Sequence, residues 1–182
     1  MRELALHILD LMMNSIEAEA SRIILCIEES QKENLLKIRI RDNGKGMSPD
    51  TVQKVLDPFM TTRTTRSVGM GLPLMRQAAI ESNGDLTIES EIDRGTQLNI
   101  QLELGHINRM PLGDIATTLV NLMICSPGIH LFYFHKTDCS KFCFDSFWFC
   151  SQMKKTKCTL YELVQPAIAK INTNLRRINS IS

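Results

Sequence analysis

The sequence contains no stretch that approaches the run of roughly 18 apolar residues that a membrane span requires. Its amino-terminal apolar segment carries Glu3 and Asp10, whereas the apolar region of a secretory signal is uncharged. No two cysteines have CxxC spacing, and the intervals among the six cysteines fit no structural zinc pattern. We therefore expect a cytoplasmic protein without a membrane span, whose cysteines are reduced thiols that pack in the fold.

The net charge is small, and charge is unevenly distributed along the chain. The 182 residues are 43% apolar and 23% charged, which is typical of a globular protein, and the formal net charge is +1. Residues 1–104 hold 12 Lys and Arg against 16 Asp and Glu, a net charge of −4, whereas residues 105–182 hold 9 against 4, a net charge of +5. The basic second part suits an acidic partner, a nucleic acid or the acidic first part, but a solvated basic surface is the simpler interpretation.

Hydrophobic periodicity predicts the elements of residues 1–104. Apolar residues at helical spacing predict a helix over 3–20, with Asp10 and Asn14 one turn apart on its polar side. Alternating residues predict strands. The remaining expected elements are strands over 22–28 and 35–41, a short helix from Pro49, a helix over 72–82, and a hairpin of strands 86–91 and 96–104.

Residues 105–182 are expected to form a small α+β appendage. The pattern predicts a helix over about 112–124, strands over 129–135 and 141–145, and a final helix. A capping box of Thr159 and Glu162 opens this helix, and Pro166 is expected to kink it. Most aromatic residues lie in this part, where we expect the majority in the core and the exposed remainder in a contact surface.

Three short polar and glycine-rich motifs stand out in the first part. The run Asp42-Asn43-Gly44-Lys45-Gly46-Met47 follows a predicted strand, Asn14 begins the segment NSIEA on the first helix, and Gly69-Met70-Gly71-Leu72 precedes another helix. By itself, Asp-Asn-Gly also predicts a simple surface turn. A buried carboxylate, however, is the acceptor that best recognises the exocyclic amine of adenine. The three motifs together therefore predict a nucleotide site.

In order and spacing these motifs resemble the ATP-binding site of the histidine kinase-like ATPase superfamily (GHKL, or Bergerat fold). This superfamily unites the catalytic domains of histidine kinases with gyrase B, the Hsp90 chaperones and MutL. The resemblance covers residues 1–104 and implies an α+β fold, a two-layer sandwich with helices over one face of a mixed sheet. It also implies ATP and Mg²⁺ as ligands. Residues 105–182 resemble no kinase element, and we expect them to complete the core or to dock a partner.

The resemblance assigns roles to individual residues. Asp42 would accept the adenine amine, Gly44, Gly46 and Met47 would line the base, and Thr96 would hydrogen-bond near it. Asn14 would bind Mg²⁺, because this ion keeps several waters and needs few protein ligands. Asp10 would act as a general base or would orient a metal-bound water, and it is one methylene shorter than the glutamate of the hydrolytic branch.

Residues 60–71 would form the ATP lid. Backbone N–H groups from Ser67 to Gly71, at the start of a helix, suit the phosphates. Arg63 and Arg66 would add charge against the β- and γ-phosphates, or are simply solvated. Phe59 matches the family's phenylalanine box, although a single Phe is also a common core residue. The expected nucleotide-binding residues of this region are Phe59, Thr62, Arg63, Arg66, Ser67, Val68, Gly69, Met70, Gly71 and Leu72.

The order of phenylalanine, paired glycines and helix in the lid is most similar to histidine kinases. The resemblance therefore implies transfer of the γ-phosphate of ATP to a histidine on a separate partner in signal transduction. We find no phosphoacceptor motif or dimerising hairpin before the catalytic part, and His7 begins no such motif. An anti-sigma-type serine/threonine kinase and an ATP-gated interaction module with little turnover remain alternatives. We expect no nucleic-acid partner, and a homodimer is left open.

Overall fold

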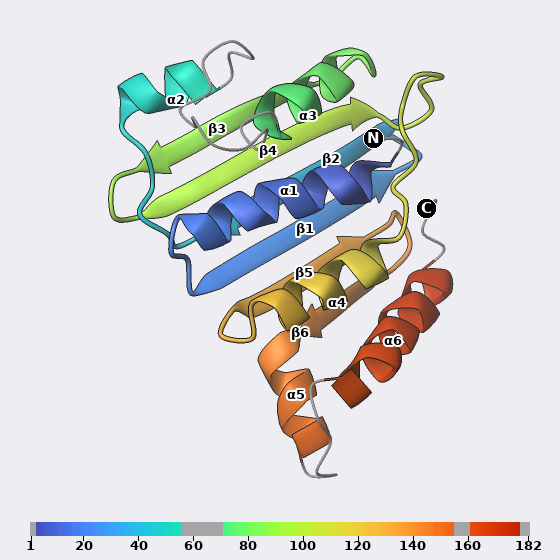
Figure 1. Cartoon of the computed structure of the whole chain (residues 1–182). Helices are drawn as coiled ribbons and strands as arrows, with labels where there is room; N and C mark the ends of the chain where they lie inside the picture. Colours follow the sequence, from blue (N-terminus) through green and yellow to red (C-terminus); the bar gives the residue numbers. More distant parts are fainter. Residues whose placement is uncertain (1–2, 56–70, 155–160, 179–182) are drawn as a thin grey trace.

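The computed structural model describes residues 3–55, 71–154 and 161–178, which form a two-layer sandwich of helices on one mixed sheet (Figure 1). The strands are β1 (Arg22–Ser30), β2 (Leu35–Asp42), β3 (Asp85–Glu91), β4 (Gly95–Glu103), β5 (His130–Lys136) and β6 (Lys141–Asp145). The helices are α1 (Leu4–Glu17), α2 (Pro49–Val55), α3 (Gly71–Ile80), α4 (Ile115–Cys125), α5 (Ser146–Lys154), the 3₁₀ turn η1 (Tyr161–Leu163) and α6 (Val164–Arg177). The predicted α+β fold is confirmed.

The sheet has the strand order β3-β4-β2-β1-β5-β6. Tight turns join β1 to β2, β3 to β4 and β5 to β6, and each of these pairs is antiparallel. The pairing of β1 with β5 is parallel, and β4 has the same direction as both strands, so the connection from β4 to β5 is a crossover, which contains α4. Residues after 105 therefore extend the same sheet as the first part.

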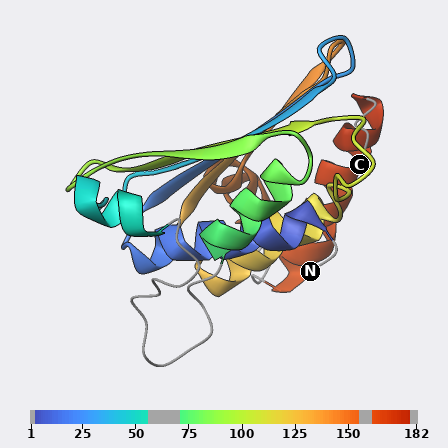
Figure 2. The same ribbon diagram turned by 90° about the horizontal axis from the view of Figure 1, so that it is seen from above.

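One face of the sheet carries the core. Residues alternate along each strand, so that Ile23, Leu25 and Ile27 of β1 are fully buried against the helices. On α1, Leu4 and Ile8 are buried at helical spacing on the side that faces the sheet. Figure 2 shows α1, α3 and α4 beneath this face, while no described helix covers the opposite face. No helix among the described residues is long and apolar enough to cross a membrane.

The structure differs from the sequence predictions mainly after residue 105. Helix α4 begins at Ile115 and not near 112, because the side chain of Asp114 caps it by accepting a hydrogen bond from the Thr117 amide at 2.9 Å. Helix α5 was not predicted. Pro166 is the third residue of α6, in the first turn, where its missing N–H costs no hydrogen bond within the helix, so it does not kink the helix. Thr159 of the predicted capping box lies outside the described residues.

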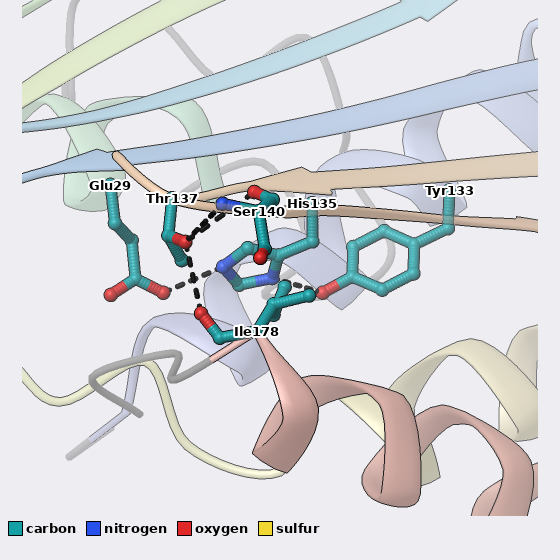
Figure 3. A network of polar contacts seen from close by, with 6 residues as sticks. All are labelled: Glu29, Tyr133, His135, Thr137, Ser140 and Ile178. Atoms are coloured by element: carbon teal, nitrogen blue, oxygen red, sulfur yellow. Dashed lines mark hydrogen bonds and ion pairs between the residues drawn. The ribbon is translucent and has the colours of Figure 1, made fainter.

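A buried polar cluster joins β1 to β5 at the end of the sheet away from Asp42 (Figure 3). The His135 ring bonds the Glu29 carboxylate through Nε2 and the Tyr133 hydroxyl through Nδ1, both at 2.6 Å. Burial, together with the charge of Glu29, raises the pKa of Tyr133 well above its ordinary value. Ile23 pairs with Asp42, and Glu29 lies six residues further along β1, so the cluster is roughly 20 Å from Asp42 at about 3.3 Å per residue.

Candidate nucleotide-binding site

Asp42 is the last residue of β2, and its side chain points toward the helices. It is 8% exposed. The Ser15 hydroxyl of α1 donates to Oδ2 at 2.8 Å, and the backbone amides of Gly44 and Thr96 donate to Oδ1 at 2.9 and 3.2 Å. All three donors are neutral, and a carboxylate offers about four lone-pair positions. The arrangement therefore fixes an anionic acceptor that can accept a further hydrogen bond.

The loop after Asp42 packs closely against the end of α1. The Lys45 amide donates to the Ala18 carbonyl at 2.9 Å, and a Cβ on Gly44 would lie 2.6 Å from that same oxygen. The Asn43 side chain accepts hydrogen bonds from the Ser21 and Arg22 amides at 3.1 and 2.8 Å. Only glycine permits this approach, so the turn joins the end of α1 to the start of β1.

The other side of the loop is held by the hairpin of β3 and β4. Gly46 has φ of +63°, and a Cβ there would overlap the Glu91 carbonyl oxygen. The Met47 amide donates to Ser90 Oγ at 2.8 Å, and Ser90 Oγ lies 2.9 Å from Thr96 Oγ1. Ser90 thereby links the glycine loop to the residue that also holds Asp42.

Asp10 and Asn14 form the second part of the site. They lie one turn apart on α1 and are half-buried, and neither side chain makes a hydrogen bond or ion pair with the described residues. Gly71, the first residue of α3, lies against both: a Cβ there would be 3.3 Å from Asp10 Cβ and 4.0 Å from Asn14 Nδ2. A carboxylate and an amide oxygen without partners, next to a helix start, suit a hydrated cation and phosphate oxygens.

His7 lies one turn before Asp10 on α1. It is 4% exposed, and its Nδ1 is buried with no hydrogen-bond partner among the described residues. Burial lowers the pKa of His7, because the charged imidazolium would lose its hydration. The side chain is therefore a neutral part of the helix packing.

The structure brings the predicted residues together in two groups. Asp42, Gly44, Gly46, Met47 and Thr96 surround one end of the glycine loop, and Asp10, Asn14 and Gly71 meet where α3 approaches α1, with Leu72 half-buried in the next position of α3. The other lid residues lie outside the described residues, namely Phe59, Thr62, Arg63, Arg66, Ser67, Val68, Gly69 and Met70. Contacts of any of these residues with a nucleotide stay predictions.

Three residues that shape the site were not predicted from the sequence. Ser15 follows Asn14 directly, but only the fold shows that its hydroxyl meets a carboxylate 27 residues away. Asn43 was read as part of a turn signal, and its side chain in fact ties the turn to β1. Ser90 has no sequence signal apart from its place one residue before the end of β3.

These residues fit ATP and Mg²⁺. The buried Asp42 carboxylate suits the amine of a purine, and the Asn14 oxygen, which has no partner among the described residues, suits a cation that keeps most of its water shell. Asp42 is hydrogen-bonded to Ser15 of α1, and Asn14 is itself a residue of α1, so both groups lie on the helix side of the sheet. Because Asn14 directly precedes Ser15, the donor to Asp42, both groups lie at the same end of α1, as one extended ligand requires.

Comparison with known proteins gives related kinases and a related fold. A family model described as histidine kinase-, DNA gyrase B- and HSP90-like ATPase matches residues 2–106. Sporulation kinase C of Bacillus subtilis (strain 168) is 28% identical over 96 residues, which are 53% of this chain and 22% of that protein. Sensor histidine kinase ZraS of Escherichia coli (strain K12) is 24% identical over 106 residues, 58% of this chain and 23% of that protein.

A solved structure agrees on the fold. The crystal structure of the N-terminal domain of a DNA repair protein superposes with a TM-score of 0.58 at 15% identity, covering 80% of this chain and 53% of that one. The chain spans less than a quarter of the length of the two kinases above. Family members bind ATP, typically with Mg²⁺. The family match covers more than half of the chain, and the chain belongs to the histidine kinase-, DNA gyrase B- and HSP90-like ATPases.

Proposed function

We propose that this chain binds Mg²⁺-ATP between α1, the glycine loop and the start of α3, and that it transfers the γ-phosphate to a histidine on a partner protein. The proposal rests on two groups that lie along α1. The buried Asp42 carboxylate is held by three neutral donors, one of them Ser15 of α1, and the Asp10 and Asn14 side chains of α1 have no hydrogen-bond or ion-pair partner among the described residues. One group suits a purine and the other suits a metal and phosphate.

Each residue has a distinct task in this proposal. Asp42 accepts the adenine amine, and Ser15, Gly44 and Thr96 hold its carboxylate in position so that little reordering is needed on binding. Asn14 would supply an oxygen ligand to the cation, and a bound cation would partly neutralise the charge of the phosphates. Asp10 would orient a water at the cation or would accept a proton from the attacking group.

The acceptor is the less constrained part of the proposal. Phosphoryl transfer depends mainly on positioning and charge neutralisation, so the same pocket serves a histidine or a serine acceptor. Related histidine kinases support the histidine. The anti-sigma type of serine/threonine kinase is the alternative with another acceptor.

One feature favours a second candidate, an ATP-gated interaction module with little turnover. Asp10 has a shorter side chain than glutamate, and it stands against Gly71, the residue at which α3 begins. A short carboxylate reaches less far toward an attacking water, whereas a nucleotide held at this point would still fix the start of α3. Binding would then change a surface without rapid hydrolysis.

Incubation with γ-labelled ATP, Mg²⁺ and candidate acceptor proteins tests the proposal. Asp42→Asn is the inactive variant, and Asp114→Asn is the matched control, because Asn caps α4 as well as Asp does and lies outside the site. Acid-labile, alkali-stable label on an acceptor supports the histidine kinase. Acid-stable label supports the serine/threonine kinase, and nucleotide-dependent binding without label supports the module. Absence of nucleotide binding by the wild-type chain contradicts all three.

A further inference from the structure

No helix of the described residues covers the face of the sheet opposite α1, α3 and α4 (Figure 2). The side chains on this face differ from one end of the strand order to the other. Over β3 and β4 the face is polar and internally bonded: Asn99 donates to Glu89 at 3.1 Å and accepts from Arg39 at 3.2 Å. Over β1, β5 and β6 it has an apolar centre, and charged residues such as Glu28, Lys136 and Asp145 lie at the ends of these strands. Phe134 is 43% exposed in this apolar centre, and Ile24 and Phe132 are half-buried neighbours. We call Ile24, Cys26, Phe132, Phe134 and Cys143, which are the apolar and cysteine residues among the outward positions of these three strands, the open-face patch.

Two further aromatic contacts extend this patch. Phe147, at the start of α5, is 47% exposed and stacks on His130 with ring centroids 4.2 Å apart and planes 3° from parallel. His130 in turn contacts Phe132 at 4.1 Å between ring centroids. An apolar patch with exposed aromatic residues is a common feature of protein interaction surfaces.

The order of residues across the strands indicates which molecule covers the open-face patch. Strand pairing places the following residues side by side in rows that run from β2 through β1 and β5 to β6. The first row is Arg41, Ile24, Phe132 and Asp145, the second is Arg39, Cys26, Phe134 and Cys143, and the third is Lys37, Glu28, Lys136 and Lys141. In the first row a cation and an anion flank two apolar residues, and in the third an anion and a cation are central.

From this order we propose that a second copy of the chain covers the open-face patch, sheet against sheet, about a twofold axis that runs parallel to the strands between β1 and β5. Such an axis keeps each row opposite itself and reverses its order. Ile24 then faces the partner's Phe132, and Arg41 faces the partner's Asp145. Aligned packing of two sheets about 10 Å apart is an established arrangement for faces of this kind.

Charge complementarity supports this occupant. The Arg41 guanidinium makes no hydrogen bond or ion pair with the described residues. Asp145 Oδ1 accepts from the Trp148 amide at 3.0 Å and lies 2.9 Å from His130 Nε2, so the partner's Arg41 would meet the other carboxylate oxygen, Oδ2. In the third row Glu28 faces the partner's Lys136. Within one copy, Glu28 and Lys136 form only a long ion pair of 3.9 Å, with side-chain exposures of 43% and 64%. Lys37 meets the partner's Lys141 at the rim, where solvent screens the repulsion. The polar surface of β3 and β4 stays outside the interface.

The inference is independent of the proposed function, since it uses no residue of the nucleotide site. Sedimentation velocity of the full chain without nucleotide, from about 1 to about 100 µM, is the first test, because an interface of four strands is expected to bind in the micromolar range. We expect a monomer–dimer equilibrium. Phe134→Glu should weaken association at least about tenfold, while Ile107→Glu, at a site 94% exposed outside the patch, should change it less than about twofold.

A mixing experiment distinguishes this dimer from any other self-association. In a dimer of the Glu28→Lys variant, two lysines face each other at positions 28 and 136 of the two copies. In a dimer of the Lys136→Glu variant, two glutamates face each other at these positions. Each variant alone should therefore remain monomeric, whereas an equimolar mixture should form a heterodimer in which both facing pairs are attractive. The salt bridge within one copy is broken in both variants, so rescue by mixing arises only between copies.

Circular dichroism of each variant confirms that it is folded. A wild-type chain that remains monomeric at about 100 µM overturns the proposal and leaves the patch to a different partner. A dimer that is unaffected by Phe134→Glu, or a mixture that does not associate, also overturns it, because another surface must then hold the copies together.

Discussion

Replacement of Asp42 by asparagine separates folding from nucleotide recognition at the site. Asparagine keeps the shape of the side chain. Its carbonyl oxygen can accept from the Gly44 and Thr96 amides as Oδ1 does, and its NH₂ group can donate to the Ser15 hydroxyl, which is free to rotate. The native fold then loses only the charge reinforcement of these hydrogen bonds, which we expect to cost about 1 kcal/mol of the free energy of unfolding.

The effect of Asp42→Asn on nucleotide binding should be larger. The one remaining acceptor oxygen already serves two amides, so the adenine amine loses a charged acceptor and meets a donor. A hydrogen bond to a charged group contributes about 1.5–3 kcal/mol, and an unsatisfied buried donor costs about 1–3 kcal/mol more. Together these figures predict that affinity for ATP, ADP and AMP falls at least about 50-fold.

Isothermal titration calorimetry measures the affinity, and urea unfolding measures the stability. Ser15→Ala is the matched control, because it removes one hydrogen bond to the same carboxylate but leaves its charge. We expect this variant to lose about 1 kcal/mol of stability and to bind nucleotide within about fivefold of wild type. Asp42→Asn binding within about threefold of wild type would refute the assignment of Asp42 to adenine.

Three other perturbations test separate features. Asn14→Ala should remove most of the Mg²⁺-dependent part of ATP affinity and leave AMP affinity within about twofold, as calorimetry with and without Mg²⁺ will show. Gly46→Ala should lower the free energy of unfolding by at least about 2 kcal/mol, because Gly46 has φ of +63° and faces the Glu91 carbonyl. The control is Gly128→Ala, where a Cβ would meet no atom within 4 Å, and it should cost less than about 1 kcal/mol in the same urea titration. Burial holds the pKa of His7 below its ordinary value of 6.5, so the unfolded chain binds a proton at His7 more readily than the folded chain does. The contribution of neutral His7 to the free energy of unfolding is therefore complete above pH 6.5 and is lost as the pH falls below 6.5. His7→Leu should therefore reduce the fall in unfolding free energy between about pH 7.5 and about pH 5, and an unchanged fall would contradict this account.

The elements of residues 1–104 were predictable because local patterns determine them. Alternation in β2 and helical spacing in α1 correspond to one buried face each, so periodicity gave the element type and placed the ends within about three residues. The three nucleotide motifs were predictable for a related reason. Each is short and lies at the junction of two elements, where glycine and polar residues have conformational roles.

The arrangement after residue 105 depends on contacts far apart in the sequence. The parallel pairing of β5 with β1 has no local signal, so the sequence could not show that an expected appendage continues the first sheet. Glu29 illustrates the limit. The predicted strand ended at residue 28, but Glu29 is buried within β1 because His135, 106 residues later, bonds its carboxylate. Helix α5 directly follows β6 and has no amphipathic pattern that would predict it.

A crystal structure of the chain with Mg²⁺ and a non-hydrolysable ATP analogue tests the central claim most directly. The account predicts that the adenine amine is hydrogen-bonded to the Asp42 carboxylate and that the cation is bound to the Asn14 side-chain oxygen, with the phosphates beside Gly71. A nucleotide bound elsewhere, or an Asp42 carboxylate that contacts only Ser15, Gly44 and Thr96 in crystals that contain the analogue, would contradict it.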